Sequence, residues 1–135
     1  MSTLIISKRR KDGVMILDLS GGIKLGEENA YLHHTIKDLV TAGEKKILLN
    51  LGEVTKIDSS GMGEIIAAWT TLQTNGGEVR LLNLTKSVEE LMMLTKLLTV
   101  FETYENEDDA IASFKAKTTN PLDNQVWKNA EVSFS

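Results

Sequence analysis

The spacing of apolar residues changes several times along the chain, and each change predicts a new element. Two short β-prone runs come first, Leu4 to Ser7 and Val14 to Leu19. The dipeptide Asp12-Gly13 between them is typical of a tight hairpin turn. We therefore predict an antiparallel hairpin, and we expect the basic run at 8–11 to end an exposed strand.

A helical period follows this hairpin. The glycine-rich stretch at 20–29 is predicted to be a loop. From Glu28 to Ala42 the apolar residues recur every three or four positions, which predicts an amphipathic helix ending at Gly43. Its buried face should carry Leu32, Ile36, Leu39 and Val40.

Two nearly continuous apolar runs, at 45–51 and from Val79 to Leu84, predict strands that are covered on both faces. Between them, the helical spacing from Met62 to Leu72 predicts a second helix, which stops at the glycines after Thr74. Strands of this kind alternating with helices are typical of a parallel sheet.

The remaining elements complete an α/β pattern. Ser87 and Glu90 have the spacing of a capping box and predict a third helix. The run at 99–104 predicts a short strand, and 105–117 a last helix with acids first and lysines last. We therefore expect four or five strands in a mostly parallel sheet, with an N-terminal hairpin and about four helices.

Length and composition are those of one globular domain. The chain has 135 residues, of which 41% are hydrophobic and 25% charged. We place the domain at 1–116 and a tail at 117–135, either flexible or docked through Trp127 and Phe134.

Charge and hydropathy exclude several classes of function. The net charge of -4 gives no footprint for direct nucleic-acid binding. No apolar run approaches the roughly 18 residues that span a membrane, and the N-terminus lacks the order of a secretory signal. With no cysteine in the chain, we expect a cytoplasmic protein without membrane contact, thiolate metal site or disulfide.

The stretch KIDSSGMGEIIAAW at 56–69 lies between an apolar strand and an amphipathic helix. In parallel sheets, ligands and partners meet the carboxyl ends of strands at such junctions. The simplest interpretation is that Asp58, Ser59 or Ser60 caps the helix.

Catalytic and nucleotide-binding interpretations fit the junction poorly. A nucleophilic serine needs a base, and the two histidines of the chain, His33 and His34, are adjacent on another helix. The glycines at 61–66 lack the third member of a dinucleotide motif, and those at 21–26 lack the end of a P-loop. We therefore expect no enzyme activity, no cofactor and no bound metal.

Phosphorylation by a separate kinase is a further interpretation. A serine at an exposed helix start can receive a phosphoryl group, which adds about -1.5 to -2 charges. The helix start tolerates that charge, so the fold should survive while a docked partner is lost. Composition and spacing alone do not choose this interpretation over capping.

The sequence resembles the bacterial anti-sigma factor antagonists of the STAS family from about Leu4 to Phe114. The resemblance is centred on D-S-[ST]-G-[LM]-G at 58–63, between the apolar strand and the helix. It extends to LLNLT at 81–85 and to the aromatic and acidic residues of the last strand and helix.

The resemblance implies partner switching. In that family the unmodified antagonist binds an anti-sigma factor that is also a serine kinase, and so frees the sigma factor. The kinase, with its own ATP and magnesium, phosphorylates the first serine of the motif, here Ser59, and a PP2C-type phosphatase reverses this. The implied partner-binding residues are Asp58, Ser60, Gly61, Met62, Gly63, Ile23 and Lys24.

Two features of the motif leave alternatives open. Met62 fits a partner anchor if exposed, but it also fits the buried helical spacing. Lys24 stands where the family often has an acid, so it could pair with a phosphate on Ser59 and alter partner preference. Another role for a STAS module, such as a transporter subunit or a signalling scaffold, is the alternative function.

Overall fold

The computed structural model describes residues 4–23 and 27–118. The strands are β1 (Ile5–Lys11), β2 (Val14–Ile23), β3 (Lys46–Ile57), β4 (Glu78–Leu82) and β5 (Thr103–Tyr104). The helices are α1 (Glu27–Thr41), α2 (Ser59–Thr74), α3 (Lys86–Leu94) and α4 (Glu107–Thr118). This order of elements is the predicted one, whereas nearly all of the expected tail lies outside the described residues.

One five-stranded sheet forms the centre, with its strands in the order β1-β2-β3-β4-β5. Only the first pair is antiparallel, and the other three pairs are parallel. The predicted α/β class, mostly parallel sheet and N-terminal hairpin are therefore confirmed. At the hairpin, φ is +53° at Asp12 and +82° at Gly13, as a type I′ turn requires.

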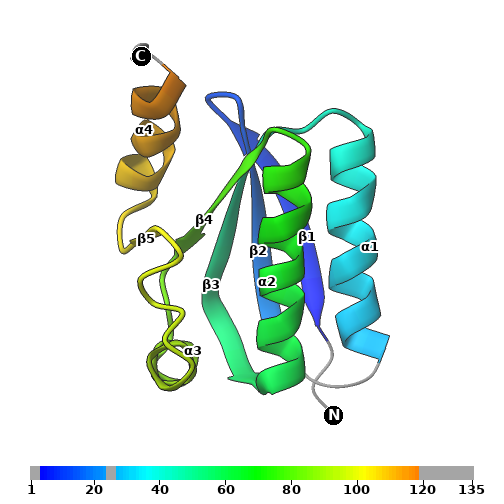
Figure 1. The fold of residues 1–135 in the computed structure, drawn as a ribbon, viewed down its shortest axis with the longest axis vertical. Helices are drawn as coiled ribbons and strands as arrows, with labels where there is room; N and C mark the ends of the chain where they lie inside the picture. Colours follow the sequence, from blue (N-terminus) through cyan, green and yellow to red (C-terminus); the bar gives the residue numbers. More distant parts are fainter. Residues whose placement is uncertain (1–3, 24–26, 119–135) are drawn as a thin grey trace.

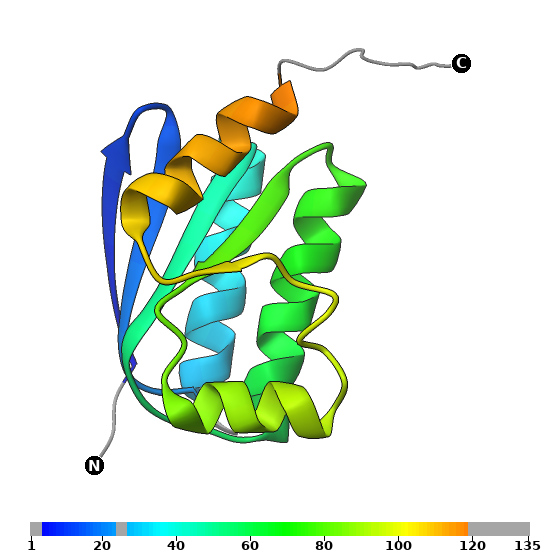
Figure 2. The ribbon, with the colours of Figure 1, turned by 90° about the vertical axis from the view of Figure 1, so that its left-hand side faces the viewer.

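Helices cover both faces of this sheet. Figure 1 shows α1 and α2 side by side on one face, with α3 seen end-on near the carboxyl end of β3. Figure 2, turned by 90°, shows α4 across the opposite face. Leu32 and Ile36 of α1 and Ile65 and Leu72 of α2 are buried in the larger core. A smaller core beneath α4 contains Phe114.

Two strands are longer than predicted, and the extra length shapes the site. The loop expected from residue 20 begins later, because Ser20 to Ile23 stay in β2 and pair with the extended end of β3. The pairing shifts register twice, and it brings Ile23 opposite Ile57. Glycines suggested a loop here, but parallel pairing to a long neighbour overrides that local preference.

The capping box predicted at Ser87 is wrong. Thr85 is the N-cap of α3, and its side-chain oxygen accepts a hydrogen bond from Val88 N–H at 3.4 Å. The helix therefore begins at Lys86, two residues earlier than the box implied. The short strand is also reduced, since only Thr103 and Tyr104 of the expected run pair with β4.

Candidate functional site

The junction between β3 and α2 is organised by Asp58. Its backbone is extended (φ -116°, ψ -174°) and its Oδ1 accepts a hydrogen bond from Gly61 N–H at 2.9 Å. Its carbonyl accepts the first helical bond, from Met62 N–H at 2.9 Å. Asp58 is thus the N-cap among the three candidates that the sequence offered.

This assignment leaves both serines outside the cap. Ser59 and Ser60 are the first two residues of α2, and both are exposed. Within residues 4–23 and 27–118, neither hydroxyl is engaged in a hydrogen bond. The first N–H groups of a helix and its dipole favour negative charge, so a phosphate on either oxygen meets a hospitable helix end.

The two glycines of the motif have different structural roles. A Cβ at Gly61 would overlap the carbonyl oxygen of Ile23 and lie 2.7 Å from its carbonyl carbon. A Cβ at Gly63 would meet nothing within 4 Å, and the position is exposed. Gly61 is therefore required by packing inside the chain, whereas only Gly63 offers open space at the surface.

The end of β2 lies directly beside this turn. Ile23 is fully buried, and its carbonyl oxygen accepts a 3.4 Å hydrogen bond from Asp58 N–H. The expected contact of Ile23 with a partner thus does not involve an exposed side chain. Lys24, the next residue, lies outside the described residues.

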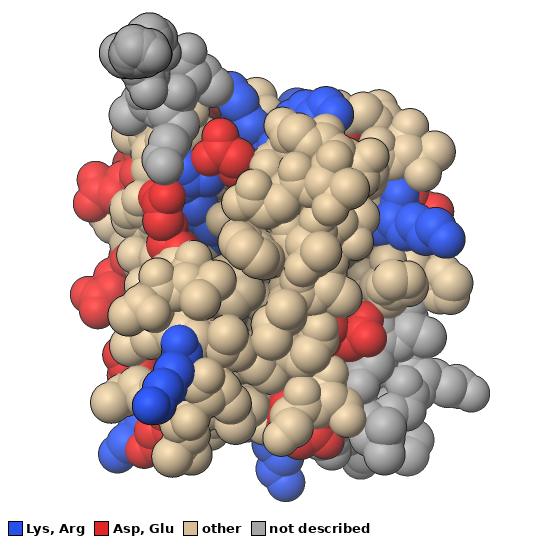
Figure 3. Space-filling view, in the orientation of Figure 1, with Lys and Arg blue, Asp and Glu red and all other residues tan. Residues whose placement is uncertain are grey.

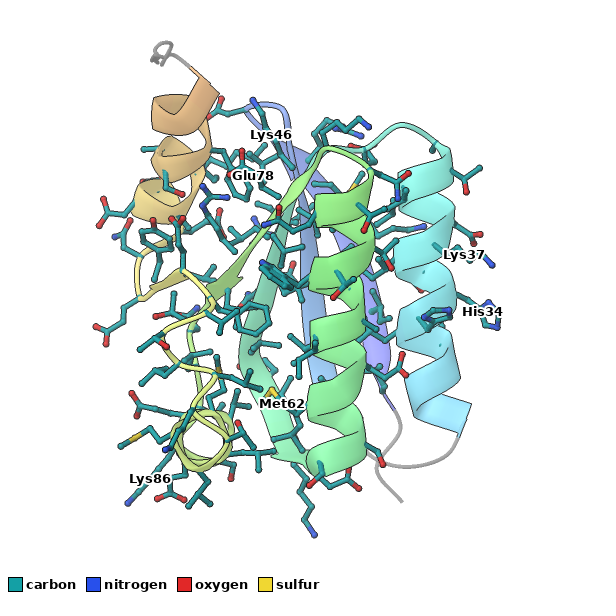
Figure 4. The ribbon with its side chains drawn as sticks, viewed as in Figure 1. His34, Lys37, Lys46, Met62, Glu78 and Lys86 are labelled. Carbon is teal, nitrogen blue, oxygen red and sulfur yellow. The ribbon has the colours of Figure 1, made fainter. Side chains whose placement is uncertain are left out.

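Met62 belongs to the core rather than to the surface. Its side chain is 2% exposed and belongs to the larger core. Figure 4 shows it directed from α2 toward the sheet. Of the two interpretations left open by the sequence, the buried one holds for the free chain, and the exposed anchor is not present.

A contact between α1 and α2 was not anticipated from the sequence. His33 Nδ1 lies 3.9 Å from Glu64 Oε1, a buried oxygen with no hydrogen-bond partner among the described residues. Figure 4 shows His34 on the outer side of α1, away from α2. A signal was available in the helical spacing, which puts one of two adjacent histidines toward the neighbouring helix.

The rest of α2 offers a surface with little charge. Glu64 is its single charged residue, and that side chain is half-buried. Figure 3 shows the resulting uncharged strip along α2, bordered by charged side chains of other elements. Such a strip costs less to desolvate against a partner than a charged helix face does.

Two kinds of feature are absent from the described part of the chain. None of its helices combines the length and the hydropathy needed to cross a membrane. Across the same residues, no three His, Asp or Glu side chains are grouped in a way that could hold a metal ion.

Comparison with known proteins gives consistent matches. A family model described as the STAS domain matches residues 6–110. A Thermotoga maritima protein named "Putative anti-sigma factor antagonist" is 28% identical over 96 residues, covering 70% of this chain and 85% of the relative. The anti-sigma F factor antagonist of Paenibacillus polymyxa is 27% identical over 121 residues, covering 83% and 96%.

A solved structure agrees with these sequence matches. The crystal structure of a Thermotoga maritima protein of the same description superimposes with a TM-score of 0.73 at 24% identity, covering 82% of this chain and 94% of that one. At that identity the likeness concerns the fold. Because the family model spans most of the sequence and the sheet has the expected topology, the chain belongs to the STAS domain family.

Proposed function

We propose that this protein is an anti-sigma factor antagonist that acts in the cytoplasm by partner switching. The unmodified form binds an anti-sigma factor that is also a serine kinase, and phosphorylation of Ser59 abolishes binding. The observation that carries the proposal is the exposed Ser59 beside a helix cap already formed by Asp58. The names of the relatives support the anti-sigma role.

In this phosphoryl transfer the antagonist supplies only the acceptor hydroxyl. Ser59 Oγ attacks the γ-phosphorus of ATP bound with magnesium in the kinase. The bond from that phosphorus to the β,γ-bridging oxygen breaks, ADP leaves, and the hydroxyl proton passes to a base of the kinase. The antagonist is the substrate, and its contribution is to hold the oxygen on a rigid, accessible helix start.

The phosphate acts as a switch without refolding. It brings about -1.5 to -2 charges to Ser59, next to the carboxylate of Asp58 and five residues before Glu64 on the same helix. The open N–H groups of α2 accommodate it in the free chain. A docked partner must desolvate it, and loss of about 2.7 kcal/mol of interface energy weakens binding about 100-fold.

The partner surface is built in two layers. Asp58, Ser60 and Gly63 lie at or near the surface around the acceptor, and the uncharged strip of α2 extends it. The buried Gly61, Met62 and Ile23 hold this surface from beneath. Lys24 directly follows Ile23 along the chain, and we assign it a charge contact with a partner or with the phosphate.

The test uses the full chain with a candidate anti-sigma factor kinase from the same organism. With Mg-ATP, mass spectrometry should find a single phosphate on Ser59, and a PP2C-type phosphatase should remove it. Ser59→Ala should bind the kinase within about threefold of the parent, and Ser59→Asp about 100-fold more weakly.

Ser60→Ala is the matched control, because it removes another exposed hydroxyl one residue further along the helix. It should still receive a single phosphate on Ser59, and that phosphate should weaken its binding to the kinase about 100-fold, as in the parent. Equal binding of Ser59→Ala and Ser59→Asp would reject the switch, and would leave a STAS module in another role, such as a transporter subunit or a scaffold.

A further inference from the structure

A groove of about 440 Å³ lies at the opposite end of α2 from Ser59. Five consecutive residues, from Gly76 to Arg80, line one side of it. The last three, Glu78 to Arg80, belong to β4. Because side chains of a strand alternate between its faces, three consecutive lining residues indicate that the edge of β4 borders the groove. The remaining walls are Trp69, Gln73, Val100 and Glu102.

We propose that this groove binds an extended peptide from another polypeptide, which adds a strand beside β4 and supplies a neutral oxygen to Arg80. The proposal is independent of the Ser59 switch. Three observations carry it. In the part of the chain that the structure describes, the sheet edge is open here and a buried donor lacks an acceptor. In addition, the charges of the groove select a particular peptide chemistry.

The open edge follows from the hydrogen-bond pattern of β4. Leu81 N–H donates to the carbonyl of Glu102 at 3.0 Å, on the β5 side. Glu78 N–H donates to the carbonyl of Lys45 at 2.7 Å, on the β3 side. By alternation, Val79 presents its N–H toward the β5 side, where β5 has not yet begun.

Among the described residues, no partner strand covers this stretch of β4. Strand β5 has two residues and pairs only with Leu81 and Leu82. Within the described ranges, no backbone hydrogen bond joins Val79 to the segment that precedes β5. An extended peptide can therefore continue the sheet at this place by main-chain hydrogen bonds.

Arg80 supplies the second observation. Its side chain is 2% exposed, and its guanidinium lies 4.3 Å above the ring of Phe114. Nη1 contacts Glu78 at 2.6 Å and Nε contacts Glu102 at 3.2 Å. Nη2 is buried and has no acceptor among the described residues. A buried donor in that state favours any occupant that brings an oxygen.

The charges of the groove favour a neutral oxygen over a carboxylate oxygen as the acceptor for Arg80. The two carboxylates of Glu78 and Glu102 already exceed the single charge of Arg80. A third carboxylate would meet like charge, so an amide oxygen of Asn or Gln fits better. Basic side chains elsewhere on the same face of the peptide would favour the two glutamates.

The alternation of side chains along the added strand determines which peptide residues face Arg80 and which face the opposite side of the sheet. Val79 and Arg80 point to opposite faces of the sheet, since Val79 belongs to the larger core and Arg80 stacks on Phe114. Adjacent residues of the peptide must alternate in the same way. We expect an Asn or Gln toward Arg80, with an apolar residue on either side of it directed toward Trp69 and Val100.

Hydrogen exchange of the full chain tests the open edge directly. The amide of Val79 should exchange at least about tenfold faster than that of Leu81, although both side chains are buried. Equal protection of the two amides would mean that the edge is already covered, by another part of the chain or by a second copy, and would overturn the proposal.

A peptide titration tests the occupant. The probe is acetyl-Lys-Val-Gln-Val-Lys-amide, followed by the backbone amide of Val79 and the indole N–H of Trp69 in NMR spectra of the full chain. Replacing Gln by Leu should weaken binding about tenfold, because Arg80 Nη2 again lacks an acceptor. Replacing it by Glu should weaken binding about threefold. No shift at millimolar peptide would overturn the proposal.

Matched variants locate the site. Val100→Asp should abolish the shifts, since it replaces the apolar wall that faces the valines of the peptide by a carboxylate that must lose its water when the peptide binds. Met93→Asp should not, because Met93 is similarly exposed (60%, against 44% for Val100) and does not line the groove. In Arg80→Met the Gln and Leu peptides should bind equally. An unchanged Gln preference there, or equal effects of the two Asp variants, would contradict the proposal.

Discussion

The two ends of α2 show opposite ways of handling polar groups. At the first end, Asp58 caps the helix and leaves the hydroxyl of Ser59 exposed. At the other end, Arg80 is buried with a donor that has no acceptor among the described residues. The helix cap at the first end is satisfied and leaves a serine hydroxyl exposed, whereas at the second end a buried guanidinium nitrogen has no acceptor among the described residues.

This difference teaches what each end can do. A free hydroxyl on a satisfied helix start can be modified with little change to the fold, so it suits a covalent switch. An unpaired buried donor beside an open strand gains from non-covalent association. The two sites can therefore act on different partners, and their variants should separate into distinct classes.

The largest effect is expected at the Ser59 end, from Gly61→Ala. A methyl group there overlaps the backbone oxygen of Ile23, and backbone cannot move aside as a flexible side chain does. We expect the free energy of unfolding to fall by about 3 kcal/mol, despite the better helix propensity of alanine. Urea denaturation followed by circular dichroism measures this.

Gly63→Ala provides the control, two residues along the same helix. A methyl group there meets nothing within 4 Å, so helix propensity alone should raise stability by about 0.5–1 kcal/mol. Equal effects of the two substitutions would mean that the close approach of α2 to β2 does not exist in solution.

The next largest loss of stability is expected from a substitution at the Arg80 end. Arg80→Ala removes the packing on Phe114 and leaves a cavity, and it should cost about 2 kcal/mol of unfolding free energy. Arg80→Met fills the space without a charge and should stay within about 1 kcal/mol of the parent. The measurement is again urea denaturation, at neutral pH.

The comparison of these two variants decides what Arg80 is for. If Arg80→Met were as unstable as Arg80→Ala, the ion pairs with Glu78 and Glu102 would be stabilising the fold by themselves. The groove would then need no further occupant to explain a buried arginine.

The two ends of α2 also differ in how well the sequence predicted them. The structure of the Ser59 end could be predicted from neighbouring residues, because the cap, the helix start and two glycines all lie within 58–63. The order of elements was likewise predictable from apolar spacing. Local signals failed where tertiary pairing decides, as at Ser20 to Ile23, which continue β2 despite their glycines.

The Arg80 end had no local signal. The sequence VRLLNL predicted only a buried strand, and no residue near Arg80 indicated that its guanidinium would be buried as well. Its burial depends on Phe114, which comes 34 positions later and stacks on its guanidinium. The short β5 that leaves the edge open was also overestimated, since the apolar run at 99–104 says nothing about how many residues pair.

The smallest change in stability is expected from the ion pairs between the N-terminal hairpin and α4, the helix that packs over Arg80. Hydrogen bonds from Arg9 hold the pKa values of Asp18 and Glu107 below their ordinary values of 3.8 and 4.5. Groups with a lowered folded pKa stabilise above the unfolded pKa, and this stability is lost as the pH falls through the folded pKa. Since these side chains are partly exposed, we expect about 1 kcal/mol or less.

Arg9→Gln should therefore lower the free energy of unfolding by that amount at about pH 7, and by progressively less below about pH 4.5, where the parent loses the same contribution. Urea titrations across this range measure the difference, and Lys8→Gln, on the same strand, is the control. Lys8 forms no ion pair within the described residues.

Because the pairs reach α4 and not the start of α2, kinase binding at Ser59 should stay unchanged in Arg9→Gln. A parallel loss of kinase binding would show that the two ends of α2 are coupled rather than independent.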